Sequence, residues 1–206
     1  MQFYSALTLA DHRHTHDGGY PGYLHAPTVK EIQTLLSKTS LAKHYKLDEI
    51  IDCKYRVTFV SPGYTIASIS LIMTLNHPAT KSSIDVSLCT ARLATIENNC
   101  GALHLSGMSV PNQRSGLGSL FLREIMKWCY EVGYTMICCN TAGNHQNTQA
   151  LPFFKKHGFL QMGKSYVNAR SGNINVWLQK FLRNGDPTTW VDENQDDDWN
   201  DEDFDA

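Results

Sequence analysis

Apolar residues recur along this chain with two different spacings, which predict a mixture of helices and strands. Helical spacing follows Thr28, and Glu31 completes the pattern of a capping box, so we expect a helix to about residue 37. A longer amphipathic helix is expected over 117–132, with Gly133 as its C-terminal stop. Its inward face should consist of apolar residues at helical spacing: Leu117, Leu120, Phe121, Ile125, Trp128, Cys129 and Val132.

Alternation of apolar and polar residues predicts the strands. Residues 54–60 and 64–75 alternate well and are joined by a Ser-Pro-Gly turn, a combination typical of a hairpin. The remaining expected elements are strands at 3–10, 102–110, 136–139, 160–164 and 173–180, a short helix at 41–52 and a helix after Asn147. Residues 76–101 give no assignment. The order β-α-α-β-β-β-α-β-α-β-β predicts an α/β (α+β) fold.

Charge is distributed unevenly and divides the chain into two parts. Residues 184–206 carry ten of the 20 acidic residues and no Lys or Arg, so this acidic tail is expected to be disordered. Residues 1–183 then hold all 18 Lys and Arg against the other ten acids, a balance of +8. With 42% hydrophobic residues, this first part is long enough for one domain with a sizeable core.

Cysteine usage and the apolar runs favour a cytoplasmic protein. The six cysteines are scattered with no spacing typical of a zinc site or a disulfide framework. The first residues lack the basic start and apolar core of a signal peptide, and no apolar run approaches the roughly 20 residues that span a bilayer. We therefore expect no membrane association.

A glycine-rich turn precedes the long helix and is the strongest indication of chemistry. Residues 113–118 read Gln-Arg-Ser-Gly-Leu-Gly between an extended run and the helix N-terminus. Backbone N–H groups and the helix dipole converge at such a turn, which favours a pyrophosphate ligand. A dinucleotide-binding loop would need a third glycine. A Walker A string does occur at 158–165, but its interior looks like a strand and no helix follows it.

A second motif lies downstream of the turn. Asn147, Ala150, Phe153, Gly158 and Phe159 stand in the register Asn-x-x-Ala-x-x-Phe-x-x-x-x-Gly-Phe. With the glycine turn and the strand between them, these residues resemble the GNAT superfamily of N-acetyltransferases over about 102–182. The resemblance implies a mixed, mostly antiparallel central sheet flanked by helices. It also implies acetyl-coenzyme A as co-substrate and an amine of a small molecule or a protein as acceptor.

The same resemblance implies the coenzyme site. The central strand would pair its backbone with the pantetheine arm, the turn would bind the pyrophosphate, and Asn147 would hydrogen-bond the pantetheine or cap the next helix. A glycine at 107 fits the close approach of another backbone, although a β-bulge is the alternative. The residues placed against the coenzyme are Ser106, Gly107, Met108, Gln113, Arg114, Ser115, Gly116, Leu117, Gly118, Ser119, Asn147 and Phe154.

The catalytic residues of the family are not all present. Phe154 stands where the family usually has the Tyr that protonates the departing thiolate, and Tyr166 is a candidate substitute. The strand at 136–140 lacks the carboxylate that many relatives use as a base. His104 and His145 are the candidate bases because histidine titrates near neutral pH.

Other readings of the chain stay open. His12, His14 and His16 could share one face of a strand as metal ligands, but no further ligand can be named, so we expect a polar loop near the acceptor and no metal site. The basic first part also suits a nucleic-acid-directed enzyme of this fold. A third alternative is a non-catalytic coenzyme-binding protein whose acidic tail binds a basic partner or the body itself. A homodimer is open too.

Overall fold

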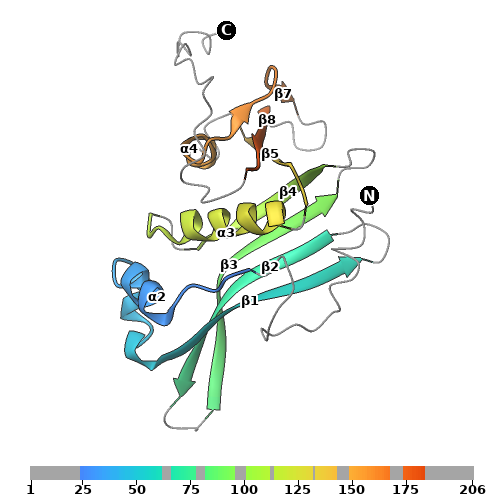
Figure 1. Ribbon diagram of the computed structural model, residues 1–206. Helices are drawn as coiled ribbons and strands as arrows, with labels where there is room; N and C mark the ends of the chain where they lie inside the picture. Colours follow the sequence, from blue (N-terminus) through green and yellow to red (C-terminus); the bar gives the residue numbers. More distant parts are fainter. Residues whose placement is uncertain are drawn as a thin grey trace.

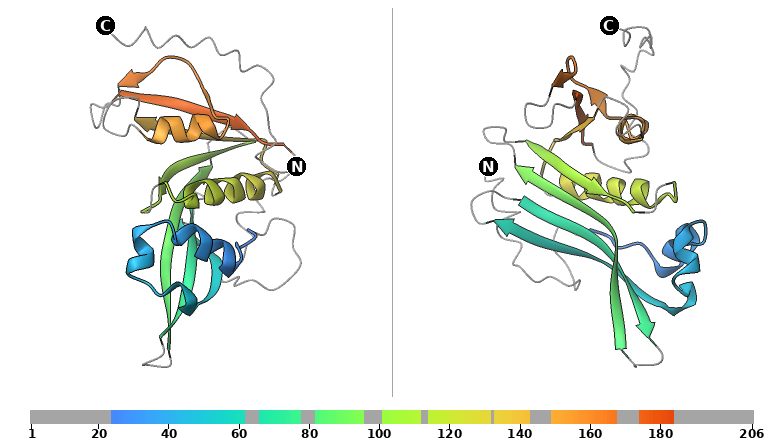
Figure 2. Two further views of the ribbon diagram at one scale, coloured as in Figure 1. Left: turned by 90° about the vertical axis from the view of Figure 1, so that its left-hand side faces the viewer. Right: turned by 180° about the vertical axis from the view of Figure 1, so that it is seen from behind.

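The computed structural model describes residues 24–61, 66–77, 82–95, 101–111, 114–131, 133–142, 149–167 and 174–183. These residues form one sheet with helices packed on one of its faces (Figures 1 and 2). The strands are β1 Ile50–Ser61, β2 Ile66–His77, β3 Ser82–Thr95, β4 Ala102–Ser109, β5 Met136–Ala142, β6 Leu160–Gln161, β7 Tyr166–Val167 and β8 Ile174–Phe181. The helices are α2 Val29–Leu36, α3 Leu117–Glu131 and α4 Ala150–Lys156.

The sheet is mixed and mostly antiparallel, as predicted. Its strands lie in the order β1-β2-β3-β4-β5-β8-β6, and β7 pairs with β8. Among the described strand pairs, β4 and β5 alone run parallel, with α3 as the connection between them. The strand expected at 3–10 lies outside the described residues, so the full element order stays a prediction.

The first described helix begins at the predicted capping box. The Thr28 hydroxyl accepts a hydrogen bond from the Glu31 N–H at 3.2 Å, and the Glu31 carboxylate accepts one from the Thr28 N–H at 2.8 Å. These two bonds satisfy backbone donors that the first turn of α2 cannot pair internally. Ile32 and Leu36 are fully buried and attach the helix to the core.

The helix expected at 41–52 is wrong. Two short 3₁₀ turns, Ser40–Lys43 and Leu47–Glu49, occupy its first part. The chain then enters β1, where Ile50 pairs with Leu75 of β2. Pairing along the sheet, together with the β-branched residues at 50 and 51, outweighs the local helical spacing.

Residues 82–95 form a 14-residue strand that the sequence pattern did not reveal. Leu71 of β2 pairs with Cys89, whereas the next residue, Ile72, pairs with Ser87, so Leu88 is an extra residue in β3. This β-bulge buries Leu88 and Cys89 consecutively. The alternation of apolar and polar residues is broken there, which explains why no strand could be assigned.

The long helix confirms its prediction closely. α3 buries a broader stripe than expected, because Leu122 and Met126 are buried as well, while Leu120 is half-buried. Gly133 has φ +99°, its N–H donates to Tyr130, and the Tyr134 N–H donates to Cys129. These are the bonds of a Schellman motif, which ends the helix at the predicted glycine.

Four further elements confirm the later predictions with different limits. β5 extends beyond the predicted 136–139 to Ala142, and α4 supplies the helix expected after Asn147. The strand predicted at 160–164 is reduced to the two residues of β6. β8 matches the strand predicted at 173–180 within one residue at each end.

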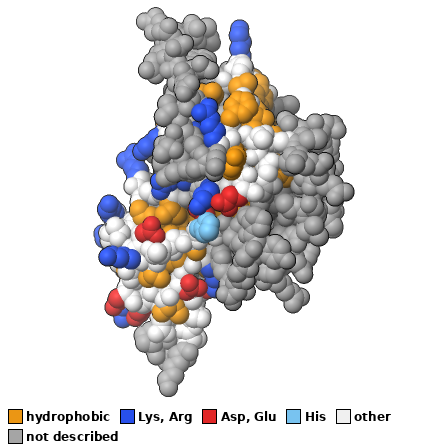
Figure 3. All heavy atoms as spheres, in the orientation of Figure 1, with side chains coloured by type: hydrophobic (Ala, Val, Ile, Leu, Met, Phe, Trp, Pro, Cys, Tyr) orange, Lys and Arg blue, Asp and Glu red, His pale blue; other side chains and the backbone are white. Residues whose placement is uncertain are grey.

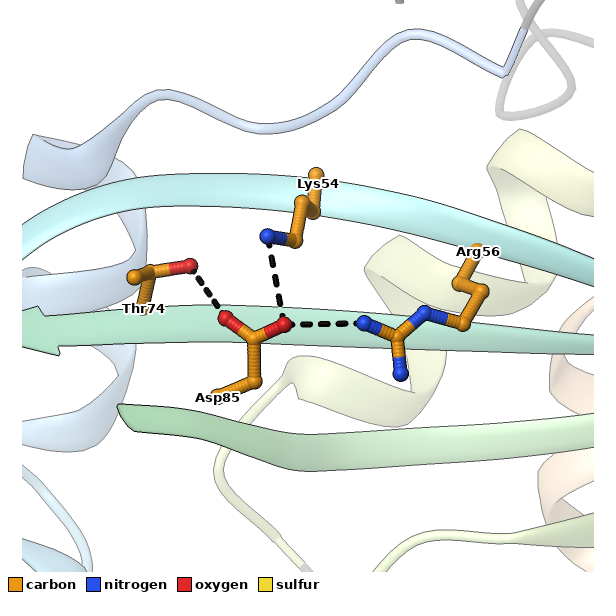
Figure 4. A network of polar contacts seen from close by, with 4 residues as sticks. All are labelled: Lys54, Arg56, Thr74 and Asp85. Carbon is orange, nitrogen blue, oxygen red and sulfur yellow. Dashed lines mark hydrogen bonds and ion pairs between the residues drawn. The ribbon is translucent and has the colours of Figure 1, made fainter. Parts of the chain in front are cut away.

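The core lies between the helices and one face of the sheet. α2, α3 and α4 lie on the same side of the strands in the left view of Figure 2, and their apolar side chains join one buried cluster with the sheet. The opposite face of β1–β3 carries a polar network (Figure 4). There Asp85 contacts Arg56 at 2.8 Å, Lys54 at 3.2 Å and the Thr74 hydroxyl at 2.8 Å. One face of the sheet is therefore the core, and the other carries this polar network over β1–β3.

Candidate functional site

The sheet opens between β4 and β5, in front of the N-terminus of α3. The parallel ladder of these strands ends where Leu105 pairs with Cys139. β4 continues on β3 to Ser109, whereas β5 continues on β8 to Ala142. In Figure 1, β4 stays with the lower strands while β5 leaves with β8. Beyond the ladder the facing edges carry backbone groups that can bind an extended ligand.

A β-bulge shapes the β4 side of this opening. Leu105 pairs with Leu93 and Gly107 pairs with Arg92, which leaves Ser106 as the extra residue. The Ser106 hydroxyl donates to the carbonyl of Arg92 at 3.3 Å. A Cβ atom added to Gly107 would meet nothing within 4 Å. Gly107 is thus consistent both with a β-bulge and with the close approach of another backbone, because a bulge lies beside it and the space in front of it is open.

The β4 residues that are predicted to contact the coenzyme differ in whether their side chains face the opening or the core. Ser106 and Gly107 are exposed at the opening. Met108 is half-buried and packs against the core cluster. Its side chain therefore serves the core, and only its backbone borders the opening.

The glycine turn has the backbone conformation that its sequence requires. Gly116 has φ +90° and Arg114 has φ +62°, the left-handed region that favours glycine. Ser115 is buried, and its hydroxyl accepts from the Leu117 N–H at 3.2 Å. The next first-turn N–H groups, those of Gly118 and Ser119, have no acceptor within the helix by α-helical geometry. The turn and the helix dipole can therefore hold an anion.

Side chains of the turn contribute less than its backbone. The Leu117 side chain is completely buried, so this residue can reach a ligand only through its main chain. The Ser119 hydroxyl lies 3.0 Å from Nε2 of His157 on α4. Arg114 is exposed and is free to swing towards a phosphate.

Three basic side chains influence His157, which lies beside Ser119 of α3. Burial, followed by the charges of Arg123, Lys156 and Lys180, lowers the pKa of His157 to about 4. His157 is therefore neutral at pH 7, and the three cations lie close enough to influence it. Figure 3 shows basic side chains in blue over the left and centre of the surface. Of these cations, Lys180 is buried, Arg123 is half-buried and Lys156 is exposed.

A second cluster lies on the other side of the opening and contains two predicted catalytic residues. His104 on β4 stacks on Trp177 of β8, with ring centroids 5.3 Å apart and planes 20° apart. Asn140 is the first β5 residue beyond the β4–β5 ladder, and its amide donates to the Tyr166 hydroxyl at 3.2 Å. Asn140 also forms a side-chain hydrogen bond with His104. Asn140 thus joins His104 to Tyr166.

The environment of His104 favours its neutral form. Burial lowers the pKa of His104 below its ordinary value, and the hydrogen bond with Asn140 opposes that shift. Its Nε2 atom is buried and has no hydrogen-bond partner among the described residues. A buried ring nitrogen without a partner is costly, which makes it a candidate to accept a proton or a hydrogen bond from a ligand.

The sequence did not indicate the two partners of His104. Asn140 was noted only as the end of a strand without a carboxylate. The alternation of side chains along β5 could have indicated its position. It puts Asn140 and Cys138 on the face of the sheet opposite the buried Ile137 and Cys139. Trp177 similarly alternates with the buried Val176 and Leu178 of β8. Alternation could assign the face of each residue, but only the strand order brings them together.

Other predicted site residues have different outcomes. Gln113, His145 and Asn147 lie outside the described residues. Phe154 is buried, and its ring meets those of Phe153 and Phe159 edge to face at 5.3 and 5.1 Å. Phe154 is thus a core residue of α4.

His12, His14 and His16 lie outside the described residues. Over the described ranges, no three His, Cys, Asp or Glu side chains gather as metal ligands. None of the helices in those ranges is long and apolar enough to cross a membrane.

The similarity of this chain to known proteins comes from a comparison with solved structures. No family model matches the sequence, and no curated protein matches it. A protein from Desulfovibrio desulfuricans assigned to the GNAT family of acetyltransferases aligns with 17% identity and a TM-score of 0.48, over 57% of this chain and 70% of its own. The ribosomal-protein-S18-alanine N-acetyltransferase from Escherichia coli aligns with 15% identity and a TM-score of 0.42, over 66% and 76%.

A third structure was solved with acetyl-CoA. It is assigned as an acetyltransferase from Salmonella typhimurium and aligns with 16% identity and a TM-score of 0.43, over 60% of this chain and 67% of its own.

Proposed function

We propose that this protein transfers the acetyl group of acetyl-CoA to an amine. The observation that carries the proposal is the end of the β4–β5 ladder at Leu105, directly in front of the glycine turn. An extended arm and a pyrophosphate need these two features side by side. The backbone of β4 can pair with the arm, and the first turn of α3 can bind the phosphates.

The residues present fit such a ligand on two independent grounds. Gly116 holds a left-handed conformation that directs the turn into the helix, and Gly107 leaves the edge of β4 open. The half-buried Arg123 and the exposed Lys156 near His157 add positive charge that favours phosphate binding. When bound, acetyl-CoA supplies an acetyl thioester at the opening.

The chemistry requires a base and a route for a second proton. The acceptor nitrogen bonds to the acetyl carbon while the carbon–sulfur bond breaks, and the sulfur leaves as a thiolate. Nε2 of neutral His104 accepts the proton that the amine loses. The Tyr166 hydroxyl, held by Asn140, can donate a proton towards the thiolate. A thiol with a pKa of about 8.5 also leaves without full protonation.

The test combines binding and turnover in one sample. Acetyl-CoA is titrated calorimetrically into the protein, and free thiol is then followed across a panel of amines. We expect saturable binding and amine-dependent thiol release. Absence of coenzyme binding would sink the proposal, and binding without release across the panel would favour a non-catalytic binding protein.

His104→Gln separates the base from the coenzyme site. Coenzyme affinity should stay within about threefold, whereas kcat/KM should fall about 10²–10⁴-fold, the usual contribution of a general base. In the native protein, kcat/KM should fall as the pH drops through the lowered pKa of His104, and the variant should lose this limb. An unchanged pH profile would exclude His104 as the base.

A nucleic-acid-directed acceptor is the second candidate. The balance of +8 over residues 1–183 favours it, because Lys and Arg supply most of the affinity for phosphates in polymers. Titration of a short RNA at several salt concentrations distinguishes it. Affinity that falls steeply with salt would support this candidate, and absence of binding at low salt would exclude it.

A further inference from the structure

The polar face of the sheet is organised in rows that run across β1–β4. Strand pairing aligns Thr58, Ser68, Arg92 and Gly107 in one row, and Arg56, Ser70, Thr90 and Ser109 in the next. The residues that alternate with them along the strands, such as Tyr55, Leu71 and Leu93, belong to the core cluster. Apart from Gly107, every residue in these two rows has a hydroxyl or guanidinium side chain.

The two rows carry positive charge and no carboxylate. Arg56 is held by Asp85, which also pairs with Lys54, so these three side chains together keep one positive charge (Figure 4). Arg92 is exposed, and no ion pair links it to another described residue. Arg92 is therefore the guanidinium available to an anion on this face.

Arg92 stands beside the proposed reaction centre. It lies directly opposite Gly107, beyond the point where β4 has parted from β5. His104 lies on the same face of β4, opposite Ala94. Neighbouring rows on one face are separated by roughly 7 Å, the rise of two strand residues. The guanidinium and the proposed base are thus within the span of one small molecule.

Gly107 keeps the space between them open. A Cβ atom at this position would meet nothing within 4 Å, so neither the core nor a neighbouring strand requires glycine there. Its φ is not in the positive range, so the backbone does not require it either. A side chain at 107 would stand between Arg92 and the opening.

We propose that the acceptor amine carries a carboxylate or phosphate that Arg92 binds, with the Ser68 and Thr90 hydroxyls beside it. The proposal rests on the proposed acetyl transfer and specifies its substrate class. Arg92 would act as a specificity residue: it fixes the anionic end so that the amine faces His104. Guanidinium groups suit planar carboxylates and phosphates because they donate two parallel hydrogen bonds.

The test uses amine pairs that differ only in the anionic group. Lysine is compared with 1,5-diaminopentane for a carboxylate, and glucosamine 6-phosphate with glucosamine for a phosphate. In at least one pair, kcat/KM for the member that carries the carboxylate or phosphate should exceed that of the partner without it at least tenfold. Whichever pair shows the preference identifies the anion.

Variants of Arg92 assign the preference to this residue. Arg92→Gln should reduce kcat/KM about 10- to 100-fold for the member that carries the carboxylate or phosphate and leave that of the partner without it unchanged. Arg92→Lys should restore part of the loss. Acetyl-CoA affinity should be unaffected in both. Lys38→Gln, which removes an exposed positive charge near α2, is the matched control and should change nothing.

The outcomes separate this inference from the proposed function. Failure of the native protein to bind acetyl-CoA overturns the proposed function first. If acetyl-CoA binds but both members of each pair react equally, or Arg92→Gln leaves a preference intact, only the Arg92 inference is overturned. If no amine reacts, binding of the two members of each pair is compared by thermal shift. The absence of a difference that depends on Arg92 would then also overturn the Arg92 inference. RNA binding that weakens in Arg92→Gln without any effect on small amines would assign the surface to a polyanion instead.

Discussion

Of two alanine substitutions in the glycine turn, Gly116→Ala should be damaging and Gly118→Ala nearly neutral. Gly116 has φ +90°, and a Cβ atom there would lie 3.0 Å from the end of the Leu35 side chain. Alanine at positive φ costs about 1–2 kcal/mol. Leu35 can shift by a few tenths of an ångström, so backbone strain is the larger contribution. For a chain of this length, Gly116→Ala should lower Tm by about 2–8 °C.

Gly118→Ala is the matched control within the same turn. Its Cβ atom would lie 3.4 Å from Val110 and 3.5–3.6 Å from the Phe153 ring, which are ordinary contact distances. Gly118 is not among the residues with positive φ, and alanine favours a helix by up to about 1 kcal/mol. Stability should therefore change by less than about 1 kcal/mol. The added methyl group points towards these two side chains and leaves the backbone N–H accessible.

The affinity for acetyl-CoA should depend on the backbone conformation of the glycine turn. Relaxing the strain in Gly116→Ala redirects the N–H groups of the turn, and losing one charge-assisted hydrogen bond costs about 1.5–3 kcal/mol. Kd for acetyl-CoA should therefore rise about 10- to 150-fold. Gly118→Ala should stay within about threefold. Both are measured by calorimetric titration, with folding monitored by denaturant unfolding. Native affinity in Gly116→Ala would refute the assignment of the turn, and equal damage by Gly118→Ala would refute the argument from Cβ direction.

Three further variants test the helices and the buried histidine. Thr28→Ala removes the capping box with Glu31 and should lower the free energy of unfolding by about 1 kcal/mol in denaturant titrations. Because burial lowers the pKa of His157 to about 4, its contribution to stability is present above about pH 6.5 and is lost as the pH falls towards 4. His157→Gln should therefore flatten the decline in unfolding free energy over this range. Phe154→Tyr puts a hydroxyl into an aromatic cluster and should cost about 1–3 kcal/mol.

Two of these variants have a control in the same region. Thr34→Ala changes an exposed threonine inside α2 and should not destabilise the protein, so equal losses at 28 and 34 would contradict the capping argument. An unaltered decline in His157→Gln would contradict the role of burial. Phe153→Tyr, at a half-buried position, should cost less than Phe154→Tyr. A stable Phe154→Tyr variant with faster thiol release would show that position 154 reaches the reaction centre.

Features that depend on neighbours in the chain were predictable. The start of α2 follows from a hydroxyl and a carboxylate three residues apart, and the end of α3 follows from a glycine that can adopt positive φ. The strand–turn–helix geometry around Gly116 was predictable for the same reason. In each case the determining interactions span five residues or fewer, so the sequence contains them directly.

Features that depend on strand pairing were not predictable. The bulge at Leu88 concealed β3, and pairing with β2 converted the expected helix at 41–52 into turns and a strand. Candidate bases could be named from residue type alone. Their partners could not, since Asn140 and Trp177 lie 36 and 73 positions after His104.

The sequence by itself thus determined the start of α2, the end of α3, the glycine turn and the alternation that sorts residues between two faces of a sheet. Tertiary structure alone decided where the β4–β5 ladder ends, which residues meet across it, and that Arg92 lies opposite Gly107. The physical reason is the distance along the sequence between the residues that determine each feature. Backbone dihedrals and helical contacts are set by adjacent residues, whereas strand order and register are set by the packing of the whole sheet.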